Sequence, residues 1–139
     1  MDACYGGRMD VSGVHHVAVK VVDLARAERF YVRVLGLSVL KRWPGRPGDD
    51  GRDRSLWLDL AGGGFLALER ADRTGEAKSE DGAGIHLLAL QIRRRDRDVW
   101  IAALADVGHP IYQHTDFTIY VRDPEGNRIG LSHWPEPAV

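Results

Sequence analysis

Apolar and polar residues alternate along residues 14–22, and a period of two is typical of a β-strand with one buried face. The face that we expect to be buried consists of valines: Val17, Val19 and Val21. The opposite face is mixed and carries His16, Ala18 and Lys20. This segment therefore predicts a strand that presents a histidine and a lysine on its polar side.

Helical spacing replaces the alternation directly after this strand. Asp23 is a suitable N-cap, because its carboxylate can accept hydrogen bonds from the free amides of a first helical turn. The apolar residues that follow recur at intervals of three and four: Leu24, Ala27, Tyr31, Val34 and Leu35. Gly36 can take the left-handed conformation that commonly ends a helix. The pattern predicts a helix over residues 24–35.

Three short apolar segments follow this helix, at residues 38–42, 56–60 and 65–69, and each predicts a strand. The last two are separated by residues 61–64, an alanine and three glycines, which tolerate the positive φ angles of a tight hairpin turn. The order of elements up to residue 70 is therefore strand, helix and three strands.

The same order returns in the second half of the chain. Residues 85–92 predict a strand, and Asp96 is a candidate N-cap for a helix that ends at Gly108. The expected apolar stripe of this helix consists of Val99, Trp100, Ala103, Leu104 and Val107. Three strands should follow, at residues 111–114, 117–122 and 128–132, and the last two are joined by a turn at 123–127 with suitably placed proline and glycine.

This repetition predicts an α+β protein made of two tandem βαβββ modules, with a curved mixed sheet around a shared cleft. The first module would span residues 12–70 and the second 85–135, joined by a linker at 71–84. Residues 1–11 lack any apolar pattern and are expected to be a disordered leader.

The net charge, the cysteine count and the lack of long apolar runs limit the partners and the location that we expect for the protein. The formal net charge of the 139 residues is -1, which gives no electrostatic basis for binding nucleic acid or an anionic membrane. The single cysteine, Cys4, cannot form an intrachain disulfide. No apolar run approaches the roughly 20 residues needed to span a bilayer, and the first residues do not have the apolar middle of a signal peptide. We therefore expect a cytoplasmic protein.

A histidine precedes the apolar run of each module, His16 in the first and His86 in the second. If they occupy the same place in the two copies, two imidazoles would converge on a site between the modules. Such a site would bind a metal or a small molecule. The alternative is two unrelated polar residues near strand ends, each satisfied by its own hydrogen bond.

Three stretches of the sequence carry a resemblance to a known superfamily: residues 14–24, residues 30–37 with Phe30-Tyr31 before Leu35-Gly36-Leu37, and residues 120–129 with Asp123-Pro124-Glu125-Gly126-Asn127. Across residues 12–135, the chain resembles the vicinal oxygen chelate superfamily. This superfamily includes glyoxalase I, bleomycin-resistance proteins, fosfomycin-resistance enzymes and extradiol dioxygenases. The resemblance implies the paired-module fold and a homodimer, while leaving the reaction open among isomerases, lyases, oxygenases, transferases and drug-binding proteins.

The resemblance also implies where a metal would bind. Members that bind a divalent ion such as nickel, zinc, manganese or iron take a histidine from the first strand of each module, and His16 and His86 match these positions. They take carboxylates from the last strand of the modules, where this chain has Ala67 and Gly130. Glu69 lies two residues beyond Ala67, on the same strand face and ~6.6 Å further along, and is the candidate third ligand.

Two functions follow from these residues. The first is a metal-dependent lyase, isomerase or dioxygenase of the glyoxalase type, in which Glu69 or Tyr120 acts as the acid-base group and Lys20 and Trp57 contact the substrate. The second is a metal-free protein that binds an antibiotic or metabolite. In that case Ala67 and Gly130 leave room for the ligand, and the histidines donate or accept hydrogen bonds.

Overall fold

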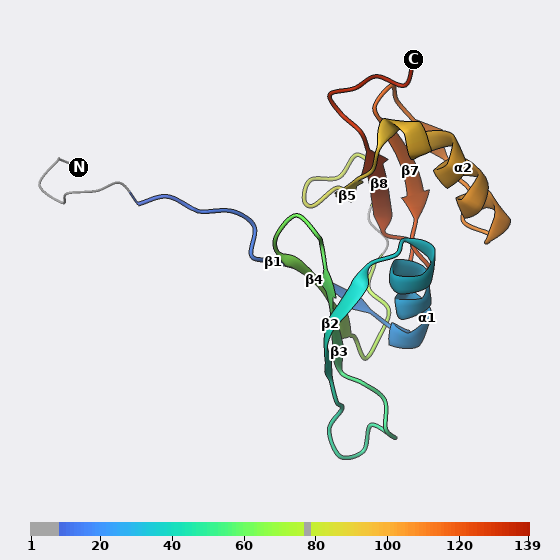
Figure 1. Ribbon diagram of the computed structural model, residues 1–139. Helices are drawn as coiled ribbons and strands as arrows, with labels where there is room; N and C mark the ends of the chain where they lie inside the picture. The colour runs from blue at the N-terminus through green and yellow to red at the C-terminus, as the bar shows by residue number, and fades with distance from the viewer. Residues whose placement is uncertain (1–8, 77–78) are drawn as a thin grey trace, which may run out of the picture.

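Two four-stranded sheets and two helical segments make up the computed structural model, which describes residues 9–76 and 79–139 (Figure 1). The strands of sheet A are β1 (His16–Val21), β2 (Ser38–Trp43), β3 (Ser55–Asp59) and β4 (Phe65–Arg70). Those of sheet B are β5 (Leu88–Gln91), β6 (Gln113–His114), β7 (Thr118–Arg122) and β8 (Arg128–Ser132). The expected α+β class and the two tandem modules are confirmed.

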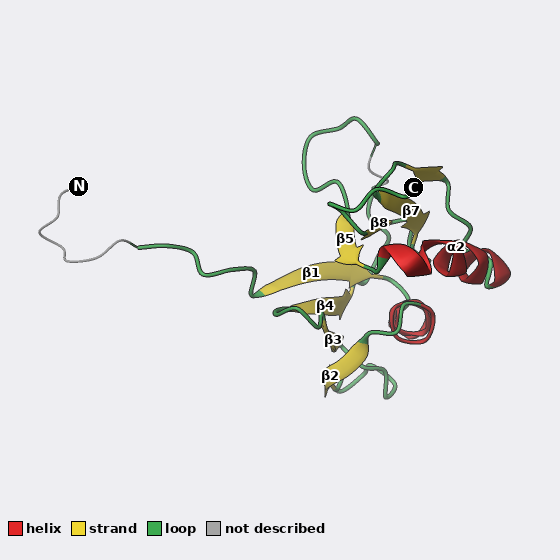
Figure 2. Ribbon diagram, turned by 45° about the horizontal axis from the view of Figure 1, so that its top comes forward, coloured by secondary structure: helices red, strands yellow, loops and turns green. Residues whose placement is uncertain are grey.

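Both sheets have the same topology. Their strand orders are β1-β4-β3-β2 and β5-β8-β7-β6, so the first strand of each module is parallel to the last and the other pairs are antiparallel. The strands thus form two separate sheets rather than one continuous curved sheet. Most of the expected leader, residues 1–8, lies outside the described residues, and residues 9–11 are in no regular element (Figure 2).

The first helical segment changes its hydrogen bonding halfway along. An α-helix, α1 (Leu24–Glu28), continues directly into a π-helix, η2 (Arg29–Val34). Asp23 is the N-cap, as expected, because its Oδ1 accepts a hydrogen bond from the Arg26 amide at 3.0 Å. Gly36 ends the segment with a φ of 81°, also as expected.

The helix of the second module begins differently from the prediction. A short 3₁₀ turn, η3 (Arg94–Asp96), precedes α2 (Arg97–Asp106). Asp96 has a helical backbone (φ -95°, ψ 0°) and its side chain makes no capping hydrogen bond, so the expectation that it caps this helix is wrong. The physical reason is that an N-cap needs an extended backbone to direct its side chain at the free amides.

The buried side of α2 also differs from the predicted stripe. Leu104 is buried, and Trp100 and Ile101 are partly buried against the core. Val99 and Val107 are 67% and 52% exposed, so the expectation that they face the core is wrong. Helical spacing predicts how wide the apolar stripe of a helix is. It does not predict which side of the helix faces the core, because that depends on how the helix packs on its sheet.

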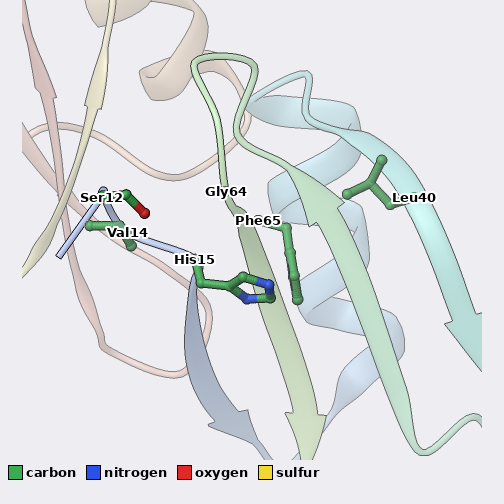
Figure 3. A pocket seen from close by; sticks show the side chains of 7 residues that line it. Ser12, Val14, His15, Leu40, Gly64 and Phe65 are labelled. Carbon is green, nitrogen blue, oxygen red and sulfur yellow. The ribbon is translucent and has the colours of Figure 1, made fainter. Parts of the chain in front are cut away.

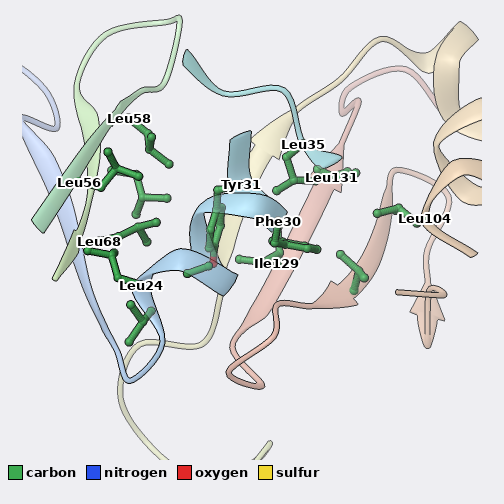
Figure 4. Close-up of a cluster of buried hydrophobic side chains, with 14 of the residues drawn as sticks. Leu24, Phe30, Tyr31, Leu35, Leu56, Leu58, Leu68, Leu104, Ile129 and Leu131 are labelled. Carbon is green, nitrogen blue, oxygen red and sulfur yellow. The ribbon is translucent and has the colours of Figure 1, made fainter. Parts of the chain in front are cut away.

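One hydrophobic core joins the two modules, and α1 with η2 lies at its centre (Figure 4). On one side this segment meets leucines of sheet A, of which Leu56, Leu58 and Leu68 are labelled in the figure. On the other side it meets the apolar residues of sheet B, of which Ile129 and Leu131 are visible beside Phe30. Each sheet therefore buries the face that points to the helices and leaves its opposite face, here called the outer face, outside this core.

A buried hydrogen bond fixes the helical segment to the second module. The Tyr31 hydroxyl donates to Oδ2 of Asp123 at 2.6 Å, and both side chains are buried. Burial, followed by the charge of Asp123, raises the pKa of Tyr31 far above its ordinary value. Asp123 also accepts hydrogen bonds from the amides of Glu125 and Asn127, so one carboxylate organises the β7–β8 turn and holds the tyrosine.

Glu125, from the same turn, holds the start of α1. Its two carboxylate oxygens accept hydrogen bonds from the amides of Val22 and Asp23, at 2.8 and 3.0 Å. A negative charge at the N-terminal end of a helix is favourable because the free amides there carry partial positive charge. The turn at residues 123–127 therefore binds the first module through a tyrosine and through backbone amides.

Within the described residues, no helix is long and apolar enough to cross a membrane. The sequence also showed no apolar run of that length.

We expect Tyr31→Phe to lower the free energy of unfolding by about 1–3 kcal/mol, because it removes the donor from a buried charged acceptor. Urea denaturation followed by far-UV circular dichroism measures the change. Tyr112→Phe is the control: Tyr112 is 40% exposed, and a surface change of this kind should stay within about 0.5 kcal/mol. Equal losses in the two variants would contradict the role given to the Tyr31–Asp123 bond.

Candidate functional site

A row of aromatic rings crosses the outer face of sheet A. His16 of β1 stacks on Phe65 of β4, with ring centroids 4.8 Å apart and planes 6° from parallel. Phe65 stacks on Trp57 of β3 at 4.4 Å, and Trp57 contacts the edge of Trp43 of β2 at 5.1 Å. We call these four side chains the aromatic row. It takes one ring from every strand of the sheet.

A β-bulge brings the end of β2 into this row. Val39 pairs with Leu58, whose side chain is in the core, whereas Lys41 pairs with Trp57 on the outer face. The register shift between these two pairs moves Lys41, and with it Trp43, onto the outer face. The Lys41 ammonium lies 4.4 Å from the Trp43 ring, close enough for a cation–π contact.

A cavity of about 450 Å³ lies beside Phe65 of the aromatic row (Figure 3). Its lining comes entirely from the first module: Ser12, Gly13, Val14, His15, Leu40, Gly64 and Phe65. This differs from our expectation of a cleft shared by both modules. Gly64 allows the approach of the chain before β1, since a Cβ atom there would lie 2.7 Å from the Val14 carbonyl oxygen, and its φ is 77°.

His15 lines this cavity, and its imidazole contacts that of His16. The Nδ1 atoms of His15 and His16 are 2.9 Å apart, so one ring donates a hydrogen bond to the other. His15 also meets the edge of Phe65, at a centroid distance of 5.6 Å. Strict alternation along residues 14–22 would place His15 and His16 on opposite faces. His15 precedes β1, which begins at His16, so the alternation of the strand does not apply to it.

The strand register shows which residues of the two modules are equivalent, and it changes the comparison of His16 with His86. Ala18 pairs with Ala67 in sheet A, and Ala89 pairs with Gly130 in sheet B. Counting back two residues from each alanine, the counterpart of His16 is Leu87, and His86 is the counterpart of His15. The expectation that His16 and His86 occupy the same place in the two modules is therefore wrong by one residue, which on a strand changes the face.

From the sequence, Ala67 and Gly130 were expected to leave room for a ligand, but both residues are buried. Ala67 is buried beneath the outer face of sheet A, and Gly130 is buried in sheet B. A Cβ atom at Gly130 would lie 3.2 Å from Cγ2 of Thr118 and 3.6 Å from Cδ1 of Leu87. The small residue at position 130 therefore accommodates these two side chains.

The donor set does not fit a three-ligand metal site. Among residues 9–76 and 79–139, no three His, Cys, Asp or Glu side chains are close enough together to hold a metal ion. A divalent first-row ion normally takes three protein ligands and keeps further positions for substrate. In the described chain the histidines of the first module are a pair without a nearby carboxylate or third imidazole.

The other residues expected at the site fall on both sheets. Lys20 and Glu69 are register partners on the outer face of sheet A, further along the strands than His16. Tyr120 pairs with Gly130 on sheet B, and His86 is exposed just before β5. The structure thus brings His16, Trp57 and Ala67 together and places Tyr120, Gly130 and His86 on the other module.

Three residues of this site were missed from the sequence: His15, Trp43 and Phe65. Phe65 shares the parity of Ala67, so its place on the outer face could have been read from the alternation. Trp43 could not, because the bulge in β2 changes its face.

Residues 13–131 match the family model described as the Glyoxalase/Bleomycin resistance protein/Dioxygenase superfamily. This match covers most of the chain, and the protein belongs to that superfamily. It agrees with the fold of two βαβββ modules and with the resemblance seen in the sequence. No curated protein matches the chain.

Solved structures show the same fold. The glyoxylase/bleomycin resistance protein/dioxygenase domain from Frankia sp. EAN1pec is 26% identical, with a TM-score of 0.70 over 89% of this chain and 98% of that one. The fosfomycin resistance protein FosX from Listeria monocytogenes, complexed with Mn(II) and 1S,2S-dihydroxypropylphosphonic acid, is 17% identical, with a TM-score of 0.70 over 88% and 93%. Lactoylglutathione lyase from Agrobacterium tumefaciens is 20% identical, with a TM-score of 0.63 over 91% and 96%.

We expect Gly130→Ala to destabilise the protein by about 1 kcal/mol or more, because the added methyl group crowds Thr118 in a packed sheet. Gly62→Ala is the matched control. Position 62 has open space around it, so the loss of unfolded-state entropy should leave stability unchanged or raise it by up to about 1 kcal/mol. Thermal and urea unfolding measure both. If Gly130→Ala were as stable as Gly62→Ala, position 130 would not be packed as described.

Proposed function

We propose that this protein binds a planar aromatic small molecule on the outer face of sheet A and does so without a metal ion. The observation that carries the proposal is the aromatic row itself, four rings in contact across one sheet face. Flat π-systems pair favourably in stacked or edge-to-face geometry, by about 0.5–1.5 kcal/mol per pair beyond area burial. The adjoining cavity of about 450 Å³ lies in the range of small-molecule sites.

Each part of the face has a role in this proposal. Trp57 and Phe65 contact the ligand with their ring edges, because the two faces of Phe65 are already stacked against His16 and Trp57. Ala67, the register partner of Trp57, keeps the floor of the face flat. The His15–His16 pair supplies hydrogen bonds at the cavity end, because each ring keeps its Nε2 atom for a ligand. Lys20 lies on the same face, where its ammonium can attract an acidic substituent.

A metal-dependent enzyme of the glyoxalase or dioxygenase type is the second candidate. The FosX structure with Mn(II) and the exposed His16 on the outer face favour it. His16, His86 and Glu69 would be its ligands, and Glu69 or Tyr120 its acid-base group. The donor set of the described chain argues against it, so it ranks second.

The homodimer and the cytoplasmic location belong to the same proposal. The superfamily resemblance supports the homodimer, and the lack of a long apolar run supports the location. Size-exclusion chromatography with light scattering measures the oligomeric state, and a mass of one chain would contradict the homodimer.

Quenching of tryptophan fluorescence tests the proposed binding, with 1-naphthoate and bleomycin as planar aromatic probes. We expect saturable quenching by at least one probe, and we expect Trp57→Leu to weaken its binding by about tenfold or more, equivalent to about 1.4 kcal/mol. Trp134→Leu is the matched control, since Trp134 is 70% exposed beyond β8 and outside the aromatic row.

The same titration separates the two candidates. Binding should be the same in EDTA and after adding Mn²⁺, Zn²⁺ or Ni²⁺. Binding that needs one of these ions and is lost in His16→Ala and His86→Ala would contradict the metal-free proposal and support the enzyme. Quenching by neither probe, or equal effects of the two tryptophan variants, would also contradict it.

A further inference from the structure

Two arginines meet at one end of sheet B, away from the aromatic row of sheet A. Arg122 is the last residue of β7, Arg128 is the first of β8, and the two are register partners. By strand alternation they share the outer face with Tyr120 and Gly130, the pair two residues further along the strands. Two guanidinium side chains therefore start from neighbouring positions at one end of the outer face of sheet B.

Arg128 is a buried cation with an unused donor. Its side chain is 6% exposed. Nε donates to the His86 carbonyl oxygen at 3.2 Å and Nη2 donates to the Ser79 carbonyl oxygen at 3.4 Å. Nη1 is also buried, and among the described residues it has no hydrogen-bond partner. A buried charged donor without an acceptor is costly, so this atom favours the arrival of an oxygen ligand.

Arg122 is held in place beside it. Its guanidinium carbon lies 4.7 Å from the centroid of the Tyr112 ring, and its Nη1 donates to the Gly126 carbonyl oxygen at 3.0 Å. These contacts leave Nη2 pointing at a carboxylate, that of Glu80. The geometry of the arginine is thus set before any ligand binds.

Glu80 lies against both arginines. Its Oε1 accepts a hydrogen bond from Nη2 of Arg122 and is 3.7 Å from Nη1 of Arg128, which is too long for a hydrogen bond. The Glu80 side chain is 55% exposed, and ion pairs of exposed side chains are weak. Glu80 therefore satisfies Arg122 but not Arg128, and it is easily displaced.

We propose that Arg122 and Arg128 form a binding site for a small oxyanion, a phosphate or carboxylate group, and that Glu80 occupies this site when the anion is absent. Guanidinium groups suit this role because their planar donors match the oxygens of such anions. A phosphate or carboxylate oxygen placed between the arginines gives Nη1 of Arg128 the acceptor that Glu80 does not provide. The site uses neither the aromatic row nor the histidines, so it stands independently of the proposed aromatic ligand.

Titration with inorganic phosphate tests the site, with acetate as a second arm and with chloride added to keep the ionic strength constant. The side-chain Nε–H signals of Arg122 and Arg128 in ¹⁵N–¹H NMR spectra give the affinity. We expect a saturable shift with phosphate in the full chain. Glu80→Gln should tighten phosphate binding by about two- to fivefold, the range by which an exposed ion pair shifts an equilibrium. Tighter binding of acetate than of phosphate would identify the anion as a carboxylate, and the reverse order as a phosphate.

The control is Glu136→Gln, which removes the carboxylate from another exposed pair, Arg94–Glu136, and should leave phosphate binding unchanged. Arg128→Met should abolish binding. Arg122→Met should do the same, and because Arg122 is 43% exposed this variant avoids the risk that loss of a buried arginine unfolds the chain. Equal affinity of the Glu80→Gln variant and the unaltered protein, binding that survives Arg122→Met, or equal shifts with chloride alone would overturn the proposal.

Discussion

The hydrogen bond between Tyr31 and Asp123 is the contact on which the arrangement of the two modules depends. It joins the helical segment of the first module to the β7–β8 turn of the second, inside a core where water cannot replace either partner. Glu125 of the same turn adds a second connection at the first helical amides. Apolar residues of both sheets pack against this same segment, so within residues 9–76 and 79–139 the two modules share one hydrophobic cluster.

This packing decides where chemistry can occur. Each sheet uses its helix-facing side for the core, so the outer faces carry the remaining side chains, and the two outer faces have different characters. Sheet A presents rings and an imidazole pair, while sheet B presents two arginines at one end and a tightly packed glycine. The proposed site for a flat aromatic group and the proposed site for an anion therefore lie on different sheets. The superfamily fold supports many activities because these faces vary while the core stays the same.

Much of the fold could be predicted from the sequence because its signals are local. Alternation located the strands, glycines located the turns at 61–64 and after both helices, and Asp23 capped the first helix. The candidate site was predicted only in part. His16 lies on the face where the alternation put it, whereas Trp43 is on the outer face because of a bulge in β2. The rotation of α2 and the role of Asp96 were wrong, because both depend on how the helix meets its sheet.

By itself, the sequence determined the order of elements, the paired modules and the residue types at the carboxylate positions, Ala67 and Gly130. These features depend only on the identity of each residue and of its close neighbours in the sequence. Only the tertiary structure decided that His86 matches His15, that His16 joins an aromatic row, and that the buried Arg128 lies beside Glu80. The reason is that register is set by hydrogen bonds between strands distant in sequence, and a shift of one residue exchanges the two faces of a strand.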